Sequence, residues 1–338
     1  MPRLLLLVAL LPALLVPTAT AAGSESTRFG PLSARVRNPT YLLQLQPSPR
    51  RARVLPPGKF NLSLQLDWAN TFDKWRRSVA GGSNRGRFDL EMVRPSAAGR
   101  VGLPFGIEIG LEVPIVILTG GIADGLIQGW HGLFGLENGG RQKVPNGAFL
   151  LDVGVPGITE WKQTRPSGPR LGDITVDLRI QLLPPSRQVP GVVGSVLLKA
   201  PTGSPDHGAG SGAFDVAAAV AVEHGIGPVA VYGMVAVTAF GRTGFLGDLL
   251  YPAAVTGAFA VELVLTPHWS LVVQLRGSSP FHHSFIHPWM NRGPLGLTIG
   301  SRLHFGGLDL SIGLEQDVIV NDPSSDVALI LEASITTP

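Results

Sequence analysis

Few residues in this chain have the types and spacing that covalent chemistry needs. The sequence has no cysteine, which excludes a thiol nucleophile, a disulfide framework and a cysteine-ligated zinc site. His131 follows Trp130 and could serve as a base for Ser211, with Asp89 or Asp173 to orient it. However, no motif or spacing brings these residues together, and no G-x-S-x-G motif is present. We therefore predict that the protein is not an enzyme.

Three histidines share one segment and could hold a metal ion. His282, His283 and His287 lie in 278–293, and a spacing of four or five residues can place imidazoles around a metal. The segment contains no carboxylate, and segments rich in proline and aromatic residues often carry histidines that bind no metal. We expect neither a metal nor a cofactor, with the three histidines as the alternative.

Charged residues of both signs recur on one face of alternating segments. From Asp173 to Leu182, apolar residues occupy every second position and polar residues the positions between them. Strict alternation indicates a strand with one apolar and one polar face. The charged residues predicted on the polar face are Asp89, Glu91, Glu108, Glu112, Asp173, Asp177, Arg179, Lys199, Glu262, Arg276 and Arg302, with Asp309, Glu315 and Glu332 beyond them.

Alternation of this kind predicts twelve long strands. The expected strands are 59–70, 85–95, 99–117, 173–182, 191–202, 213–224, 228–240, 255–266, 268–277, 294–305, 307–319 and 326–336. Several exceed the 5–6 residues usual in globular proteins. Long alternating strands joined by turns are typical of a transmembrane antiparallel β-barrel, in which the apolar face meets lipid and the polar face lines the lumen.

Composition narrows the alternatives. Charged residues make up 15% of the chain and apolar residues 44%, which disfavours disorder, and a net charge of +3 is too small for nucleic-acid binding. The longest uncharged stretch, 225–241, is interrupted by glycines and proline, so a helical membrane protein is disfavoured. A soluble β-sandwich is the competing fold, but it seldom needs twelve long strands in series.

The lengths of the connections support the barrel. Short turns and longer loops alternate through the C-terminal half, as expected when short turns lie on the periplasmic side. In the N-terminal half we expect an outer loop at 71–84, an inner turn at 95–99 and one extracellular insertion at 118–171. The apolar excursion Phe149–Val155 is not counted as spanning. Counting it would give thirteen strands, and an even number would then require Tyr41–Gln46 as a fourteenth. Fourteen strands are therefore the alternative to twelve.

The N-terminus has the form of an export signal. Arg3 precedes the apolar run Leu4–Val16, and small residues follow as far as Ala22. This pattern predicts a signal peptide at 1–21 rather than a membrane anchor. Residues 22–58 would then form a periplasmic or luminal segment before the barrel at 59–338, with the basic run at 50–53 as a solvated lead-in. The expected location is a bacterial outer membrane, and the expected partners are its lipid and the barrel-insertion machinery.

The insertion contains a candidate constriction. Apolar residues in 124–136 recur at helical spacing after Asp124, which could cap the helix. This short helix could fold into the mouth of the barrel or lie on its rim. The candidate plug residues are Asp124, Trp130, His131, Phe134 and Arg141.

Several local sequences resemble a family of proteobacterial outer-membrane β-barrels of unknown function. They are Arg37-Asn38-Pro39, Trp68-Ala69-Asn70, Phe88-Asp89-Leu90-Glu91, Ile122-Ala123-Asp124, Gly129–Leu136 with Arg141, Leu171-Gly172-Asp173, Leu198–Gly203 and Ser211–Asp215. That family is distantly similar to barrels found beside aromatic-compound degradation pathways. The resemblance implies an outer-membrane barrel with no catalytic residues to carry over.

These observations predict a passive channel or transporter for small solutes. Charges that line a water-filled pore bias which solutes pass. Alternatively, opposite charges on facing walls pair and fill a narrow lumen. Two other functions are weighed against the channel. One is an outer-membrane enzyme of lipase or protease type, and the other is a non-conducting barrel that presents loops 118–171 and 278–293 to a partner.

Overall fold

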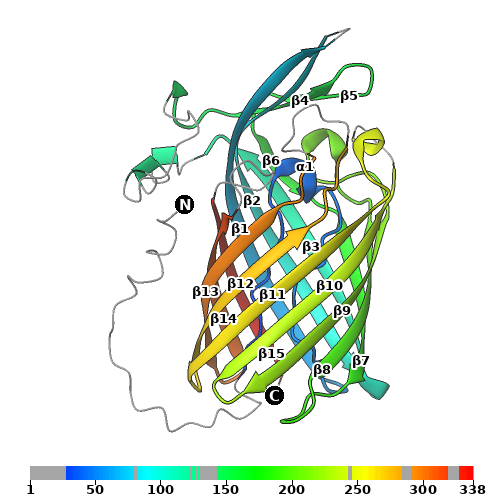
Figure 1. Ribbon diagram of the computed structural model, residues 1–338, viewed down its shortest axis with the longest axis vertical. Helices are drawn as coiled ribbons and strands as arrows, with labels where there is room; N and C mark the ends of the chain where they lie inside the picture. Colours follow the sequence, from blue (N-terminus) through cyan, green and yellow to red (C-terminus); the bar gives the residue numbers. More distant parts are fainter. Residues whose placement is uncertain are drawn as a thin grey trace.

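Twelve antiparallel strands form a closed barrel (Figure 1). The computed structural model describes residues 28–79, 82–121, 124–125, 128–129, 132, 143–242, 246–283, 291–318 and 327–337. The barrel strands are β1 (Phe60–Val79), β2 (Gly82–Leu103), β3 (Ile107–Thr119), β7 (Ile174–Leu183), β8 (Gly191–Ala200), β9 (Asp215–Ile226), β10 (Val229–Phe240), β11 (Ala253–Thr266), β12 (Trp269–Ser278), β13 (Leu295–Phe305), β14 (Leu308–Asp317) and β15 (Val327–Thr336). Pairing of β1 with β15 and of β2 with β3 closes the sheet. The predicted fold and strand number are confirmed.

Three further strands lie outside the closed ring. The strand β4 (Leu150–Val155) pairs with β2 and with β5 (Thr159–Gln163), and β6 (Ser167–Leu171) pairs with β3. The excursion at 149–155 is thus a strand that does not belong to the wall. The candidate fourteenth strand at 41–46 begins instead inside the short helix α1 (Pro39–Leu42). Three 3-10 turns complete the described elements: η3 (Pro104–Gly106), η5 (Pro205–His207) and η6 (Gly247–Leu249).

The turn expected at 95–99 lies instead at 104–106. Residues 95–99 are in the middle of β2, where Pro95 pairs with Leu66 of β1. Phe105 adopts φ +63°, which allows a tight reversal of the chain between β2 and β3. Because this turn has three residues, odd positions face outward on both sides of it. The alternation of outward and inward residues therefore continues across the turn. A search for a period of two residues does not detect the turn for this reason.

Within the predicted outer loop at 71–84, residues 71–79 and 82–84 are also strand. Pairing of β1 with β2 continues without a register shift from Phe60–Val101 to Val79–Gly82. This β1–β2 hairpin extends beyond the other strands, and β4 and β5 lie beside it at the same end (Figure 1). We call this the loop end of the barrel. The opposite end, where two-residue turns join β9 to β10, β11 to β12 and β13 to β14, is the turn end.

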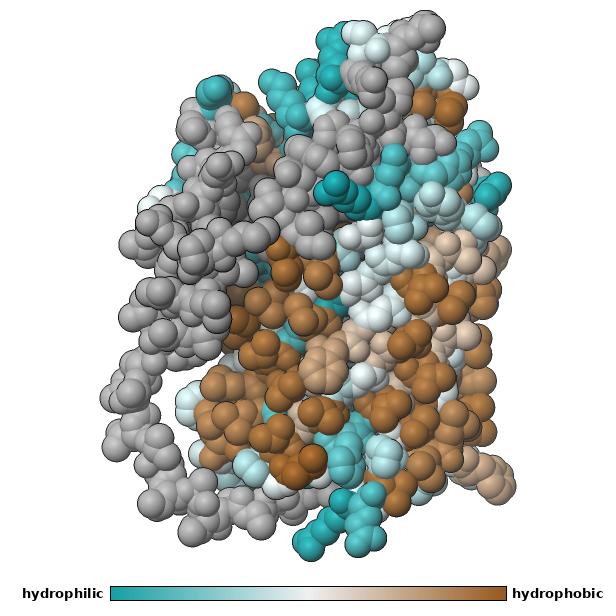
Figure 2. All heavy atoms as spheres, in the orientation of Figure 1, coloured by the Kyte–Doolittle hydropathy of each residue, from teal (hydrophilic) through white to brown (hydrophobic). Residues whose placement is uncertain are grey.

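The outer surface of the barrel is apolar and the lumen is polar. Figure 2 shows hydrophobic side chains spread over the barrel wall and hydrophilic ones at the loop end. In β10, Val235 is 60% exposed whereas its neighbour Ala236 is 1% exposed. Asp67 and Glu262 point inward and are fully buried. An apolar exterior around a polar interior is the reverse of a soluble sandwich, which excludes that alternative.

This polarity predicts how the wall tolerates a charge. Val235→Arg places a cation near the middle of the lipid-facing surface and should lower the free energy of unfolding in lipid vesicles by about 2–4 kcal/mol. The control Val235→Leu keeps the surface apolar and should change that free energy little. Denaturant titration followed by tryptophan fluorescence measures both. An equal effect of Arg and Leu would contradict a lipid-facing position.

Candidate functional site

The lumen is occupied by residues 28–58, which we call the plug segment. The plug segment begins near the turn end, where Arg302 of β13 donates to the carbonyl oxygens of Phe29 and Pro31 at 3.0 and 2.7 Å. It rises to α1 at the loop end and returns to the start of β1 (Figure 1). The two limbs contact each other, since Ser33 and Ser48 are hydrogen-bonded at 3.1 Å. The plug segment is therefore a long hairpin inside the barrel.

Side chains of the wall replace the sheet partners that the plug segment lacks. The carboxylate of Glu262 accepts from the backbone N–H groups of Phe29 and Gly30 at 3.0 and 3.2 Å. Gln274 both accepts from and donates to the backbone of Leu32, at 3.0 Å each. On the returning limb, the carboxylate of Glu223 accepts from Ala52 N–H at 2.9 Å. Buried backbone groups need such partners, so these inward side chains serve the segment directly.

Ion pairs between plug and wall reinforce these bonds. Arg37 is buried and donates to Asp67 of β1 at 2.7 Å and to Glu315 of β14 at 2.9 Å. Further down, Arg50 bridges Glu108 of β3 at 2.6 Å and Asp177 of β7 at 2.8 Å. Ion pairs this far from solvent are stable only when both charges are matched and hydrogen-bonded. The charges of the plug are thus complementary to those of the wall.

Two glycines give the plug room against the wall. Gly300 of β13 pairs with Gly313 of β14, and the side chain of Leu32 packs over both. A Cβ atom at these positions would lie 2.5 Å and 3.0 Å from Leu32 Cδ1. Substitution of either glycine would displace Leu32, so this part of the wall fits the plug segment closely.

Aromatic residues hold the tip of the plug at the loop end. The ring of Tyr41 stacks on Phe281 with centroids 4.5 Å apart, and its edge meets the ring of His282 at 5.1 Å. Burial lowers the pKa of His282 to about 3, so this ring is neutral at pH 7. The tip therefore packs against an uncharged, largely apolar surface.

An apolar cluster fills the lumen beside this tip. Its members come from the β1–β2 hairpin, β3, the strands β4 and β5, the loops and the plug segment itself. They include Leu43, Trp75, Phe88, Leu90, Met92, Val116, Leu118, Leu151, Val153, Trp161 and Leu249, each at most 4% exposed. The lumen is consequently polar in its middle and toward the turn end, and apolar at the loop end.

Most of the predicted lumen charges lie in the lumen. The inward side chains of the barrel strands include Glu108, Glu112, Asp177, Arg179, Lys199, Glu262, Arg276 and Arg302. Asp173 lies just before β7 and accepts from Lys199 at 2.7 Å. Arg276 donates to Gln46 of the plug at 3.0 Å. These residues bind the plug or pair with one another.

Asp89 and Glu91 do not face the lumen, and the prediction is wrong for these two. Glu91 pairs with Asn70 of β1. Asn70 lies on the same face of β1 as Leu64, which points outward, so Glu91 is also on the outward face. Glu91 accepts from the indole of Trp68 at 2.9 Å and is fully buried. In this part of β1 and β2 the inward side chains are apolar instead, because they belong to the apolar cluster at the loop end.

Of the candidate constriction residues, Asp124 alone lies within the described part of the chain. Asp124 is buried beside the outward face of β1, where it accepts from Asn70 at 3.3 Å and from Gly147 N–H at 2.8 Å. Residues 124, 125, 128, 129 and 132 are helical. Trp130, His131, Phe134 and Arg141 lie outside the described residues. The element that occupies the described lumen is the plug segment.

The basic run at 50–53 is not a solvated lead-in. Arg51 donates to Glu223 at 2.9 Å, and Arg179 donates to the carbonyl oxygens of Arg51 and Arg53. Sequence reasoning also missed Asp67, Glu223 and Gln274 as binding residues of the wall. One signal could have revealed the match: residues 28–58 contain six arginines and no acidic residue, while the strands carry many inward carboxylates.

Ser211 and Lys199 are the contact most like a catalytic dyad. Their Oγ and Nζ atoms are 2.5 Å apart. However, Lys199 also donates to Asp173 at 2.7 Å and lies 3.1 Å from Asp215, so its Nζ atom is engaged by two carboxylates. The group is a buried ion-pair cluster, to which Ser211 adds a hydrogen bond. Among the described residues, no three His, Asp or Glu side chains are grouped to hold a metal; His287 lies outside them.

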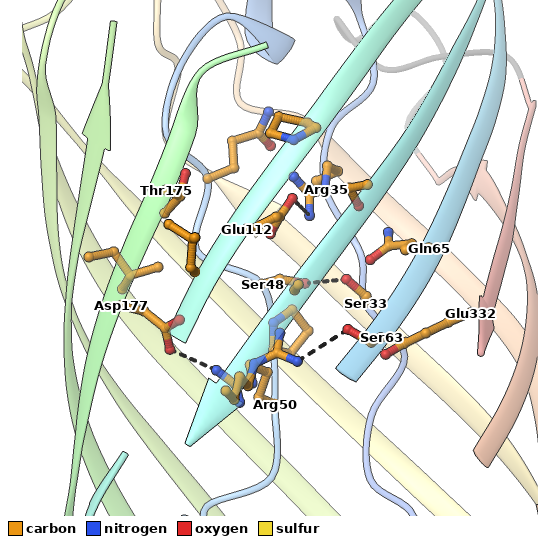
Figure 3. Close-up of a pocket in the computed structure, with 18 of the residues that line it drawn as sticks. Ser33, Arg35, Ser48, Arg50, Ser63, Gln65, Glu112, Thr175, Asp177 and Glu332 are labelled. Carbon is orange, nitrogen blue, oxygen red and sulfur yellow. Dashed lines mark hydrogen bonds and ion pairs between the residues drawn. The ribbon is translucent and has the colours of Figure 1, made fainter. Parts of the chain in front are cut away.

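A cavity lies between the plug segment and the wall. Its volume is about 280 Å³, and it is bounded by the plug, by β1, β2 and β3, and by β7 (Figure 3). Arg35 and Arg50 reach it from the plug, and Glu112 and Asp177 from the wall (Figure 3). The lumen thus holds a small, charged space beside the segment that blocks it.

The fold has counterparts among solved structures. The COG4313 outer membrane channel from Pseudomonas putida F1 is similar with a TM-score of 0.57 and 13% sequence identity, over 86% of this chain and 100% of that one. The NanC porin gives a TM-score of 0.44 at 8% identity, over 81% of this chain and 98% of that one. The Pseudomonas putida toluene transporter TodX gives a TM-score of 0.36 at 9% identity, over 94% of this chain and 98% of that one.

Sequence comparison places the chain in a family. No match was found among curated proteins. Residues 6–335, which include every barrel strand described above but for the last residue of β15, match a single family. The chain therefore belongs to the family described as "Protein of unknown function (DUF3187)".

Proposed function

We propose that this protein is an outer-membrane channel for small solutes whose lumen is closed while the plug segment occupies it. The observation that carries the proposal is a closed barrel with an apolar exterior and a polar lumen filled by a separate, non-covalently held segment. In the bacterial arrangement the turn end faces the periplasm. Solutes cross when the plug segment shifts away from the wall.

The bonds that hold the plug are suited to movement. Every described contact between plug and wall is a hydrogen bond, an ion pair or a packing contact, and the chain has no cysteine. Both ends of the segment lie toward the turn end, so its tip can withdraw without threading. A charged, polar wall remains hydrated once the plug leaves, because water can solvate its carboxylates.

A disulfide lock tests whether the plug must move. Ala52 of the plug packs with Val193 and Ala221 of the wall in a small buried cluster. In the variant Ala52→Cys with Ala221→Cys, oxidation should form the only disulfide in the molecule and tie the plug to β9. We expect discrete openings of the reduced protein in planar bilayers, and their loss after oxidation.

The controls separate the lock from the substitutions. Each single cysteine variant should conduct alike under oxidising and reducing conditions, and reductant should restore the openings of the double variant. Equal conductance of locked and reduced protein would contradict plug movement. Silence of every form, including a protein that lacks the plug, would contradict the channel itself.

A further inference from the structure

We propose that the cavity beside the plug segment is a binding site for a small organic carboxylate. This inference rests on the proposed function, because it names the class of solute that the channel would take. A volume of about 280 Å³ is near the lower end of the ~300–1,000 Å³ usual for ligand pockets, which limits the ligand to a small molecule.

The charges that line the cavity are unbalanced. The basic side chains are Arg35, Arg50, Arg51, Arg53, Arg94, Arg100, Arg179, Lys199 and Arg302. The acidic ones are Glu108, Glu112, Asp173, Asp177, Asp309 and Glu332. Three carboxylates that do not line the cavity, Asp67, Glu223 and Asp215, pair with Arg35, Arg51 and Lys199, so the excess of positive charge falls on an arginine that lacks such a partner.

The carboxylates of the wall are already engaged. Glu108 pairs with Arg50 and Arg179 at 2.6 and 3.1 Å, and Glu112 pairs with Arg94 and Arg35 at 2.8 and 3.2 Å. The partners of the others are Lys199 for Asp173, Arg50 for Asp177, His304 for Asp309 and Arg302 for Glu332. Little acceptor capacity is therefore left for a cationic ligand.

Unused capacity lies on the arginines instead. Arg100 of β2 donates only to Asn61 and Ser63, both at 3.3 Å. Among the described residues, no carboxylate oxygen lies within 4.0 Å of its guanidinium group. Its Nε atom is buried without a hydrogen-bond partner. Buried N–H groups without acceptors are costly, and an oxyanion would satisfy them.

The remaining lining fits the body of an organic acid. The side chains of Ser33, Ser48 and Ser63 lie near the arginines (Figure 3) and offer hydroxyl groups to a second oxygen. Leu42, Leu45, Val116 and Leu197 supply apolar surface on the same cavity. A planar guanidinium group binds a carboxylate through two parallel hydrogen bonds, so a carboxylate on a compact apolar group matches both parts.

Isothermal titration of the full-length protein in detergent tests the site. Benzoate is the probe, and benzamide is its neutral counterpart of the same shape. We expect benzoate to bind, and benzamide to bind about tenfold more weakly or not at all, because it lacks the charge that arginine recognises. Arg100→Gln should weaken benzoate binding by about tenfold or more, and Arg100→Lys by less.

A control variant and three contradicting results complete the test. Arg76→Gln removes an exposed arginine at the tip of the β1–β2 hairpin and should leave benzoate binding unchanged. Equal binding of benzoate and benzamide, no effect of Arg100→Gln, or inorganic phosphate binding as tightly as benzoate would each overturn the assignment. A protein that conducts without binding benzoate contradicts this site alone, whereas one that binds without ever conducting contradicts the proposed channel.

Discussion

Deletion of residues 28–52 should raise the single-channel conductance by about tenfold or more. In the intact protein this segment fills the polar part of the lumen and is hydrogen-bonded to strands all round the barrel, from β3 to β14. A twelve-stranded barrel without it would enclose a wider aqueous space through its polar part. Recordings in planar bilayers at fixed potassium chloride concentration measure the change.

The same deletion should make the pore select cations. Residues 28–52 carry five arginines and no acidic residue, so their removal takes Arg35 and Arg37 from Asp67, Arg50 from Glu108 and Arg51 from Glu223. Uncompensated carboxylates in a pore favour cations, and the reversal potential in a salt gradient should shift accordingly. A triple variant with Arg35, Arg37 and Arg50 changed to Gln weakens the plug without shortening the chain. Unchanged conductance of both variants, in protein that still shows the β-sheet circular dichroism of the native barrel, would contradict the role of the plug.

Asp67→Asn should be among the most destabilising single substitutions in the barrel. The carboxylate of Asp67 is fully buried, 2.7 Å from Arg37, 3.6 Å from Arg35 and 3.7 Å from Arg94. The amide keeps the shape but removes the charge that holds three arginines together. Removal of one member of a buried ion pair typically costs 3–5 kcal/mol, so we expect a loss of about that size in the free energy of unfolding.

A matched control distinguishes burial from charge. Asp309 pairs with His304 at 2.7 Å, but both side chains are partly exposed, so Asp309→Asn should change the free energy of unfolding by about 1 kcal/mol or less. Because Asp67 binds Arg35 and Arg37 of the plug segment, its substitution should also make this segment more sensitive to protease. If Asp67→Asn lowered the free energy of unfolding no more than Asp309→Asn does, Asp67 would not anchor the plug segment.

The barrel could be predicted from sequence because its two faces meet different solvents. In β7, apolar Val176, Leu178 and Ile180 meet lipid and alternate with inward Asp177 and Arg179, so the period of two is strong. The same regularity concealed the turn at 104–106, since a three-residue turn preserves the alternation. It also misplaced Asp89 and Glu91, because polarity alone does not tell a luminal position from one covered by loops above the membrane.

The sequence left 22–58 as a periplasmic or luminal segment, and the plug fold could not be predicted because much of its order comes from distant parts of the chain. Residues 28–58 have six prolines and six arginines and no periodic pattern, which is also the composition of a solvated linker. Leu32 is fully buried only because Gly300 and Gly313, far away in sequence, leave space for it. Long-range complementarity of this kind appears in the folded molecule and not in a local pattern.

Hydrogen–deuterium exchange of the plug segment tests the central claim most directly. The amide groups of Phe29, Leu32, Leu45, Ala52 and Leu55 donate to inward side chains of the wall. In the intact protein in detergent, peptides from 28–58 should therefore exchange on the slow timescale of the barrel strands. Exchange of these peptides within seconds, while the strands stay protected, would place the segment outside the lumen and contradict the account of a plugged channel.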